Sequence, residues 1–297
     1  MIEAKNLTKR FDGFAALDGL TLTVPTGAVY GLVGPNGSGK STLLRHVTGI
    51  YRQDAGELLV DGAPVWENPA VKARMGYIPD DVYYNVQSTV EDMRRFYRGV
   101  YPGFDQGRFE KLGKLFELPL KKPIRSMSKG QQKQAAFWLQ MSLNPEIFVL
   151  DEPVDGLDPV MRRQVWSVLM ADAAERGITV LVSSHNLREL EDVCDHVGIL
   201  ERGKLLLERS LSELQENLVK LQLALPDERP LPEDLNILHR SAAGRLQTLI
   251  VRGRREAVME RLQALQPLFL EAAPLNLEEI FIYELGGTEY EVQDILH

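Results

Sequence analysis

The hydrophobic positions of the chain form short continuous runs that alternate with segments of helical spacing. Three runs have the length of a buried strand: residues 29–33, 147–150 and 178–183. Helical spacing follows the first run at residues 41–50. Residues 159–176 begin with a proline and are followed by a glycine, as many helices are. Buried strands that alternate with helices predict an α/β fold.

Turn signals and a helical stretch interrupt this alternation. Pro25-Thr26-Gly27 and Asp61-Gly62 each separate two short apolar runs, which predicts hairpins and an antiparallel β subdomain. Residues 84–143 have a helical pattern, with Thr89 and Asp105 at the expected starts of two helices. They predict an inserted α-helical subdomain.

The pattern changes again after residue 210. It indicates two strands and then two helices: residues 219–225, 245–251, 254–265 and 276–285. Asn276 and Glu279 occupy the positions of a capping box at the start of the last helix. We therefore expect two domains, a large α/β domain over residues 1–210 and a small α+β accessory domain over residues 211–297.

Composition defines the class of protein without naming its chemistry. Hydrophobic residues make up 44% of the 297 residues and charged residues 26%, an ordinary balance for a globular chain. The net charge of -8 does not favour a nucleic-acid partner, and the single cysteine, Cys194, rules out an internal disulfide. No apolar run approaches the ~18 residues of a membrane helix, and the first residues form no signal-peptide core. A role at a membrane would therefore require a partner and take place on the cytoplasmic side.

The first predicted strand leads into a glycine-rich loop with phosphate-binding spacing. The segment fits G-x-x-x-x-G-K-[ST] between a strand and a helix, and its residues are Gly34, Pro35, Asn36, Gly37, Ser38, Gly39, Lys40, Ser41 and Thr42. In such a loop backbone N–H groups surround a polyphosphate, and glycines leave room for its approach. We expect Lys40 to reach the β- and γ-phosphates and the Ser41 hydroxyl to help hold Mg²⁺. The loop predicts binding of a nucleoside triphosphate.

Polar side chains follow directly after two other predicted strands. Asp151 and Glu152 follow the run 147–150, and His185 follows the run 178–183 after one further serine. Buried unpaired carboxylates are costly, and α/β folds place ligands at the carboxyl ends of their strands. We therefore assign Asp151 to the Mg²⁺ shell, Glu152 to the orientation or deprotonation of attacking water, and His185 to the γ-phosphate.

Together these motifs resemble the nucleotide-binding subunit of ATP-binding cassette (ABC) transporters over residues 2–210. The glycine-rich loop is similar to the family's Walker A, residues 147–152 to Walker B with its catalytic glutamate, and His185 to the switch histidine. Met127-Ser128-Lys129-Gly130-Gln131 resembles the L-S-G-G-Q signature. The resemblance implies a P-loop NTPase core and further nucleotide contacts from the signature and the D-loop: Ser128, Gly130, Gln131 and Asp158. Phe11 falls where the family has an adenine-stacking aromatic, although spacing alone equally allows a core residue.

This chain departs from the family pattern at three positions. Met127 and Lys129 differ from the usual signature, and Lys129 adds a positive charge near the expected phosphate without indicating inactivity. Asp80 stands where the family usually has glutamine. Because aspartate is a hard oxygen ligand, we expect Asp80 to reach Mg²⁺ directly or through water, with coupling to a membrane subunit as the alternative. Asp80, the segment 276–281 and the lack of membrane spans resemble the ABC-2-type exporter group.

The resemblance implies an ATPase that uses ATP and Mg²⁺ and drives a separate transmembrane permease from the cytoplasmic face of the membrane. The chain holds one Walker set and one signature, so a second ATPase subunit, identical or a paralogue, must complete each site. One alternative is a soluble ABC ATPase acting on ribosomes or nucleic acid, which would show two fused cassettes or a coiled-coil insertion. Another is a non-hydrolysing regulatory protein, which would lack Glu152 or His185.

Overall fold

The computed structural model describes residues 2–227, 230–232 and 234–285, so residues 286–297 of the predicted second domain lie outside the described residues. The chain divides into two compact units. The first consists of Met1–His185 and Val193–Glu208, and the second of Asn186–Asp192 and Arg209–His297. The second unit thus includes a short segment that the sequence pattern assigns to the first domain. The boundary after residue 210 between two independent domains stays a prediction.

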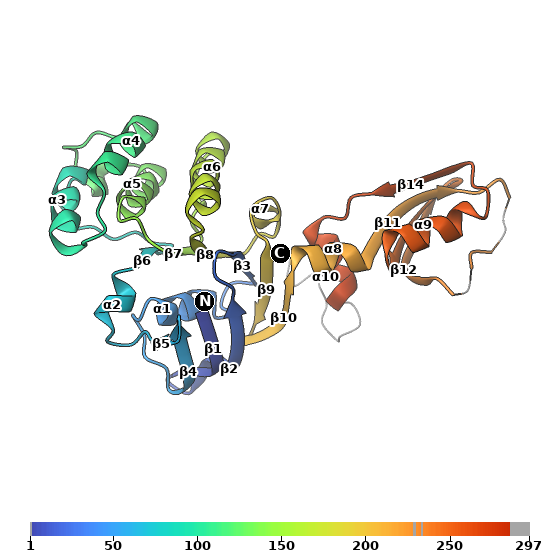
Figure 1. Ribbon diagram of the computed structural model, residues 1–297, viewed down its shortest axis with the longest axis horizontal. Helices are drawn as coiled ribbons and strands as arrows, with labels where there is room; N and C mark the ends of the chain where they lie inside the picture. The colour runs from blue at the N-terminus through green and yellow to red at the C-terminus, as the bar shows by residue number, and fades with distance from the viewer. Residues whose placement is uncertain (1, 228–229, 233, 286–297) are drawn as a thin grey trace. The chain divides into compact units, whose positions relative to one another are not determined.

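A six-stranded sheet forms the centre of the first unit (Figure 1). In spatial order its strands are β10 (Lys204–Ser210), β9 (His196–Glu201), β3 (Val29–Val33), β8 (Thr179–Ser184), β7 (Ile147–Asp151) and β6 (Met75–Ile78). From β9 to β6 all neighbours are parallel. The predicted continuous apolar runs explain this arrangement, since every residue of β3, β7 and β8 is buried. The carboxyl ends of β3, β8, β7 and β6 therefore lie along one edge.

An antiparallel sheet completes the β structure of this unit. Its strands in spatial order are β2 (Phe14–Val24), β1 (Ile2–Phe11), β4 (Ala55–Val60) and β5 (Ala63–Pro64). Asp61 and Gly62, between β4 and β5, have φ of 48° and 75°, as tight hairpin turns require. The hairpin predicted there is confirmed. The hairpin predicted at residues 25–27 is wrong, because the strands on its two sides, β2 and β3, belong to different sheets. One hydrophobic cluster joins both sheets and α1 (Lys40–Val47), and it contains Leu22, Leu32 and Leu44.

The predicted helical subdomain consists of α3 (Val90–Val100), α4 (Gln106–Phe116), the 3₁₀ helix η1 (Ile124–Ser126) and α5 (Lys129–Met141) (Figure 1). Thr89, Asp105 and Ser128 cap the three α-helices by accepting backbone N–H groups that would otherwise lack partners. Phe109 of α4 stacks on Trp138 of α5 with ring centroids 4.5 Å apart. Two further helices of this unit are α2 (Pro69–Lys72) and α6 (Pro159–Arg176), and α6 begins and ends where predicted. The predicted α/β architecture with a helical insertion is confirmed.

The second unit has the α+β structure expected from the sequence. Its sheet runs in the order β12 (Asn236–Ala243), β13 (Leu246–Arg252), β11 (Leu218–Ala224) and β14 (Phe269–Ala273), with antiparallel neighbours throughout. Its helices are α7 (Arg188–Glu191), α8 (Leu211–Asn217), α9 (Arg255–Gln263) and α10 (Leu277–Leu285). The sequence pattern indicated neither β12 nor β14. These two edge strands contain no buried residue, and β12 also lacks apolar alternation.

Two contacts join α7 to α10 within this second unit. The Arg188 guanidinium donates to Glu278 Oε2 at 2.8 Å, and the Leu277 N–H donates to Glu191 Oε1 at 3.2 Å. The predicted capping box of α10 is also present. Asn276 Oδ1 accepts the backbone N–H of Glu279 at 2.8 Å. These contacts explain why residues 186–192 belong to the second unit.

Candidate nucleotide-binding and catalytic site

The phosphate loop lies between β3 and α1, as predicted, and its shape depends on glycine. Gly37 and Gly39 have φ of 81° and 109°, which side chains rarely tolerate. A Cβ at Gly39 would lie 2.5 Å from the carbonyl oxygen of Ala16, and one at Gly34 would lie 2.1 Å from that of Leu200. At Gly37 a Cβ would have no described atom within 4 Å. The loop therefore combines tight backbone packing at its ends with an open position at its tip.

The Lys40 side chain lies within this loop and is only 6% exposed. Its Nζ donates to the carbonyl oxygens of Gly34 at 2.6 Å and Pro35 at 3.3 Å. Burial lowers the pKa of Lys40, and nearby carboxylates oppose this shift. The Ser38 hydroxyl is buried and has no hydrogen-bond partner among the described residues. The other predicted loop residues are Asn36, which is exposed, and Thr42, which lies in the first turn of α1.

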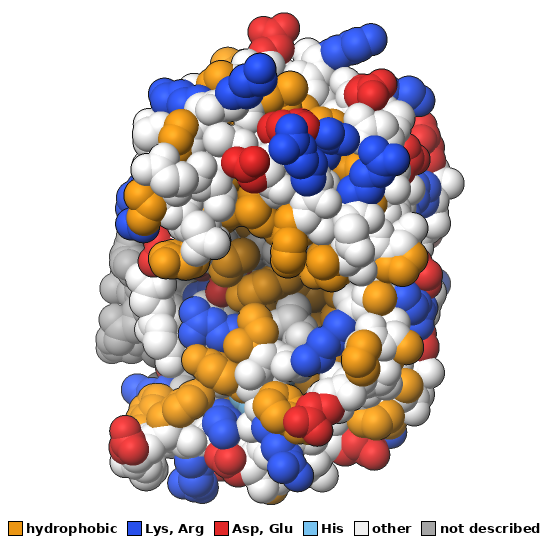
Figure 2. All heavy atoms as spheres, turned by 90° about the vertical axis from the view of Figure 1, so that its left-hand side faces the viewer, with side chains coloured by type: hydrophobic (Ala, Val, Ile, Leu, Met, Phe, Trp, Pro, Cys, Tyr) orange, Lys and Arg blue, Asp and Glu red, His pale blue; other side chains and the backbone are white. Residues whose placement is uncertain are grey.

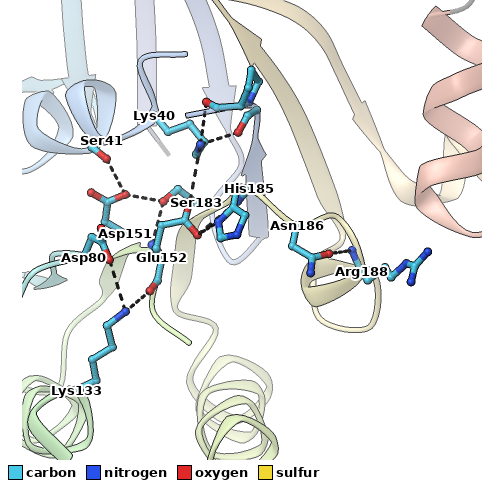
Figure 3. Close-up of polar contacts among 12 residues, drawn as sticks. Lys40, Ser41, Asp80, Lys133, Asp151, Glu152, Ser183, His185, Asn186 and Arg188 are labelled. Carbon is cyan, nitrogen blue, oxygen red and sulfur yellow. Dashed lines mark hydrogen bonds and ion pairs between the residues drawn. The ribbon is translucent and has the colours of Figure 1, made fainter. Parts of the chain in front are cut away.

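Asp151 ends β7 as a fully buried carboxylate (Figure 3). Its Oδ1 accepts hydrogen bonds from the hydroxyls of Ser41 at 3.1 Å and Ser183 at 2.7 Å. Its Oδ2 has no hydrogen-bond partner within the part of the chain that the structure describes. A buried oxygen of this kind is costly unless a cation or water binds it. A carboxylate beside a hydroxyl is a donor set that Mg²⁺ prefers, so Asp151 and Ser41 fit the predicted ion.

Glu152 and His185 contact each other at the ends of the neighbouring strands β7 and β8. Glu152 Oε2 lies 2.9 Å from His185 Nδ1, and Glu152 Oε1 lies 3.8 Å from Lys40 Nζ. Burial raises the pKa of the Glu152 carboxyl, while the hydrogen bond with His185 and the Lys40 charge oppose the rise. A raised pKa suits a group that takes a proton from water, because a base works best with its pKa near the working pH.

The predicted signature residues lie at the start of α5. Ser128 Oγ accepts the Gln131 N–H at 3.2 Å, and Gln131 Oε1 accepts the Ser128 N–H at 3.2 Å, which completes a capping box. Ser128 and Lys129 are exposed, whereas Met127 is buried. A Cβ at Gly130 would meet only ordinary contacts, the nearest at 3.5 Å. The helix N-terminus is thus formed and its first polar residues are accessible.

Three further predicted residues have other surroundings. Phe11 is 39% exposed and makes an edge contact with Tyr51 at 5.5 Å between ring centroids, so it is not a core residue. Asp158 caps α6 by accepting two N–H groups of its first turn. Asp80 Oδ1 lies 3.6 Å from Nζ of Lys133. Stacking by Phe11, nucleotide contact by Asp158 and Mg²⁺ binding by Asp80 stay predictions.

Sequence reasoning missed two residues of this site, Ser183 and Lys133. The Ser183 hydroxyl donates to Asp151 and accepts the Glu152 N–H at 3.1 Å. The Lys133 ammonium donates to the Glu152 carbonyl oxygen at 2.7 Å. A serine at the end of an apolar run was a usable signal for the first, whereas nothing in the local pattern distinguishes Lys133 from a solvent-facing lysine.

Comparisons with known proteins agree with this geometry. A family model described as ABC transporter matches residues 17–155. The ABC transporter ATP-binding protein YtrB of Bacillus subtilis is 34% identical over 288 residues, which cover 97% of this chain and 99% of that protein. The chain belongs to the ABC transporter family. The Nod factor export ATP-binding protein I of Burkholderia lata is 29% identical over 300 residues, 97% of each chain.

Solved structures give the same result for the fold. The structure of an ATP-binding subunit of an ABC transporter superposes with a TM-score of 0.67 at 26% identity and covers 72% of this chain and 92% of that one. The P-loop NTPase fold class is therefore confirmed, and the chain is an ATP-binding ABC ATPase subunit. In this family such subunits bind ATP, dimerise and act with a separate membrane permease. None of the described helices is long and apolar enough to cross a membrane.

Proposed function

We propose that this chain hydrolyses Mg²⁺–ATP and drives an ABC-2-type exporter through a separate permease, at the cytoplasmic face of the membrane. The observation that carries the proposal is the edge of the central sheet, where four side chains meet (Figure 3): Lys40, Asp151, Glu152 and His185. Asp151, Glu152 and His185 come from the ends of β7 and β8, and Lys40 begins α1 after the loop that follows the neighbouring parallel strand β3. Such edges are where α/β folds bind their ligands.

Each of these side chains suits one task in ATP hydrolysis. The Lys40 ammonium would bind the β- and γ-phosphates, and Asp151 Oδ2 with the Ser41 hydroxyl would hold Mg²⁺. The bound ion neutralises phosphate charge that develops during transfer. Glu152 would take the proton of the attacking water. His185, which hydrogen-bonds Glu152, would orient that carboxylate and contact the γ-phosphate.

A second ATPase subunit, a further copy or a paralogue, would complete each site. Ser128 and Lys129 are exposed at the N-terminus of α5, where backbone N–H groups favour an anion. Packing among the described residues gives no reason for a glycine at Gly130, since a Cβ there would meet only ordinary contacts. Close approach of a phosphate bound by a second subunit supplies such a reason. We therefore favour a head-to-tail dimer in which each signature faces the other subunit's ATP.

The permease would dock on the side of the first unit that carries α3. Four hydrophobic side chains of this region are between 56% and 77% exposed: Tyr83, Val86, Phe96 and Val100. Figure 2 views the molecule from the α3 side of Figure 1 and shows hydrophobic side chains around a hollow in that face. Exposed apolar clusters often mark protein interaction sites. The relative named for Nod factor export supports the direction of transport.

Two substitutions in the site test the proposed chemistry. Lys40→Ala should abolish ATP binding, because it removes the charge facing the phosphates. Glu152→Gln should keep ATP binding, slow hydrolysis by on the order of 10²-fold or more, and accumulate an ATP-bound dimer. Nucleotide titration, phosphate release and size-exclusion chromatography with ATP measure these three properties.

Two exposed residues supply matched controls. Lys114→Ala on α4 and Glu175→Gln on α6 make the same chemical changes on the surface and should behave as the parent. Full turnover by purified Glu152→Gln would remove Glu152 from its role. Unchanged ATP affinity in Lys40→Ala would contradict the assignment of the phosphate loop.

A further inference from the structure

Lys133 is a buried lysine that reaches the catalytic edge from the helical subdomain. It lies on α5, the helix that begins at the signature, and is 7% exposed. Its ammonium donates to the Glu152 carbonyl oxygen at 2.7 Å and lies 3.6 Å from Asp80 Oδ1 (Figure 3). A lysine is almost never buried without a partner. Its charge is therefore directed at the backbone of Glu152.

The Glu152 backbone has an uncommon conformation that needs such support. Its φ is 44°, in the left-handed region that residues other than glycine seldom occupy. Pro153 follows and disfavours the right-handed helical conformation at Glu152. The Glu152 N–H is held by Ser183 at 3.1 Å and its carbonyl oxygen by Lys133 at 2.7 Å. Both ends of the residue are thus fixed by side chains from different elements.

We propose that Lys133 is a positioning residue that aims the Glu152 carboxylate through its backbone carbonyl, with Asp80 as its charge partner. The inference rests on the proposed catalytic role of Glu152. Because the direction of a side chain follows from its backbone dihedrals, holding the carbonyl limits where the carboxylate can point. Lys133 and the signature residue Ser128 share α5. A movement of this helix against the sheet would therefore move the support of Glu152.

This arrangement also gives Asp80 a role that does not require a metal. Asp80 follows β6 and is about half exposed, with 53% of its side chain accessible. Lys133 has only 9% of its side chain accessible, so removal of Asp80 would leave a nearly buried ammonium with less compensating charge. Asp80 then affects hydrolysis through Lys133 and not through Mg²⁺ coordination.

The test measures steady-state ATPase kinetics and ATP affinity in Lys133→Met, Lys133→Arg and the exposed control Lys114→Met. A misplaced catalytic group can cost up to on the order of 10²-fold, and we expect kcat of Lys133→Met to fall at least about tenfold. The affinity for ATP should stay within about threefold of the parent value, because the substitution removes no interaction that contributes equally to the substrate complex and the transition state. Lys133→Arg, which can still donate to the carbonyl, should keep more activity than Lys133→Met. Lys114→Met should match the parent.

The same substitution in a Glu152→Gln background separates positioning from general damage. If Lys133 acts through Glu152, Lys133→Met should lower the residual rate by less than about twofold there, because coupled residues are not additive. The positioning role alone would be overturned if Lys133→Met lowered kcat by the same factor in both backgrounds. It would also be overturned if Lys133→Met kept the parent kcat while Glu152→Gln was slow. Parent turnover by Glu152→Gln would instead overturn the proposed function.

Asp80→Asn tests the charge partner. We expect a smaller loss of kcat than in Lys133→Met, an unchanged Mg²⁺ dependence, and no further loss when both substitutions are combined. A higher Mg²⁺ requirement in Asp80→Asn would overturn the pairing account and favour Asp80 as a metal ligand.

Discussion

Ser183 is a buried hydroxyl on which both carboxylate residues of the site depend. It is fully buried in β8, donates to Asp151 Oδ1 at 2.7 Å and accepts the Glu152 N–H at 3.1 Å. Ser183→Ala removes both hydrogen bonds and adds no bulk. We expect it to lower both the free energy of unfolding of the first unit and kcat.

The size of the stability loss follows from these two bonds. A hydrogen bond to an ionised carboxylate contributes about 1.5–3 kcal/mol net, and one from a backbone N–H about 0.5–1.5 kcal/mol. Ser183→Ala should therefore cost about 2–4.5 kcal/mol. Ser142 supplies a matched control, because it is equally buried and donates one bond between neutral groups, to the Trp138 carbonyl oxygen at 2.6 Å. Ser142→Ala should cost only about 0.5–1.5 kcal/mol and leave kcat unchanged.

Urea unfolding followed by tryptophan fluorescence measures the difference. The three tryptophans, Trp66, Trp138 and Trp166, all belong to the first unit, so their signal reports on that unit. With an m value of about 3 kcal/mol/M, the midpoint of Ser183→Ala should fall by about 1 M from that of the parent. Equal midpoints in the two alanine variants, together with parent kcat in Ser183→Ala, would refute the reasoning.

Two other predictions concern the pH profile and the second unit. Because burial raises the pKa of Glu152, acidification should protonate this base and lower kcat at a higher pH than for an exposed glutamate; the pH profile of kcat measures this, and an acid limb that persists in Glu152→Gln would contradict it. A chain ending after residue 210 should bind a fluorescent ATP analogue with parent affinity, because Lys40, Ser41 and Asp151 lie in the first unit. Weak binding by a truncated protein with an intact circular dichroism spectrum would count against this expectation.

Features set by local spacing could be predicted from the sequence. The phosphate loop follows from its glycines between an apolar run and a helical repeat, and the structure places it between β3 and α1. The caps Thr89, Asp105 and Asp158 follow from residue types that accept N–H groups at helix starts. The meeting of Asp151, Glu152 and His185 could also be predicted, because parallel strands bring their carboxyl ends to one edge.

Contacts between distant parts of the chain could not be predicted in this way. Lys133 stands among polar residues in the first turns of α5, and only the packing of that helix against the sheet directs it to Glu152. Residues 186–192 have no composition that distinguishes them from the first domain, yet their contacts with α10 place them in the second unit. The position of Lys133 and the unit to which residues 186–192 belong both depend on tertiary packing, which the periodicity of the sequence does not reveal.

The adjacent carboxylates of Asp151 and Glu152 both face the phosphate loop only because the regular strand geometry of β7 ends between them. Successive side chains of a strand point to opposite faces, so an extended continuation of β7 would direct Glu152 away from the side that Asp151 faces. Instead, Asp151 accepts a hydrogen bond from Ser41, and Glu152 lies 3.8 Å from Lys40, its neighbour at the start of α1. The positive φ of 44° at Glu152 makes this convergence possible.

That conformation has a cost, and the structure shows what offsets it. A left-handed residue other than glycine is disfavoured by roughly 1–2 kcal/mol, so Glu152 would relax toward an extended backbone if nothing held it. Ser183 holds its N–H and Lys133 its carbonyl oxygen, one from the central sheet and one from the helical subdomain. The orientation of the catalytic carboxylate therefore depends on how these two parts of the first unit are packed, which is why a change at either supporting residue should reduce hydrolysis more than ATP binding.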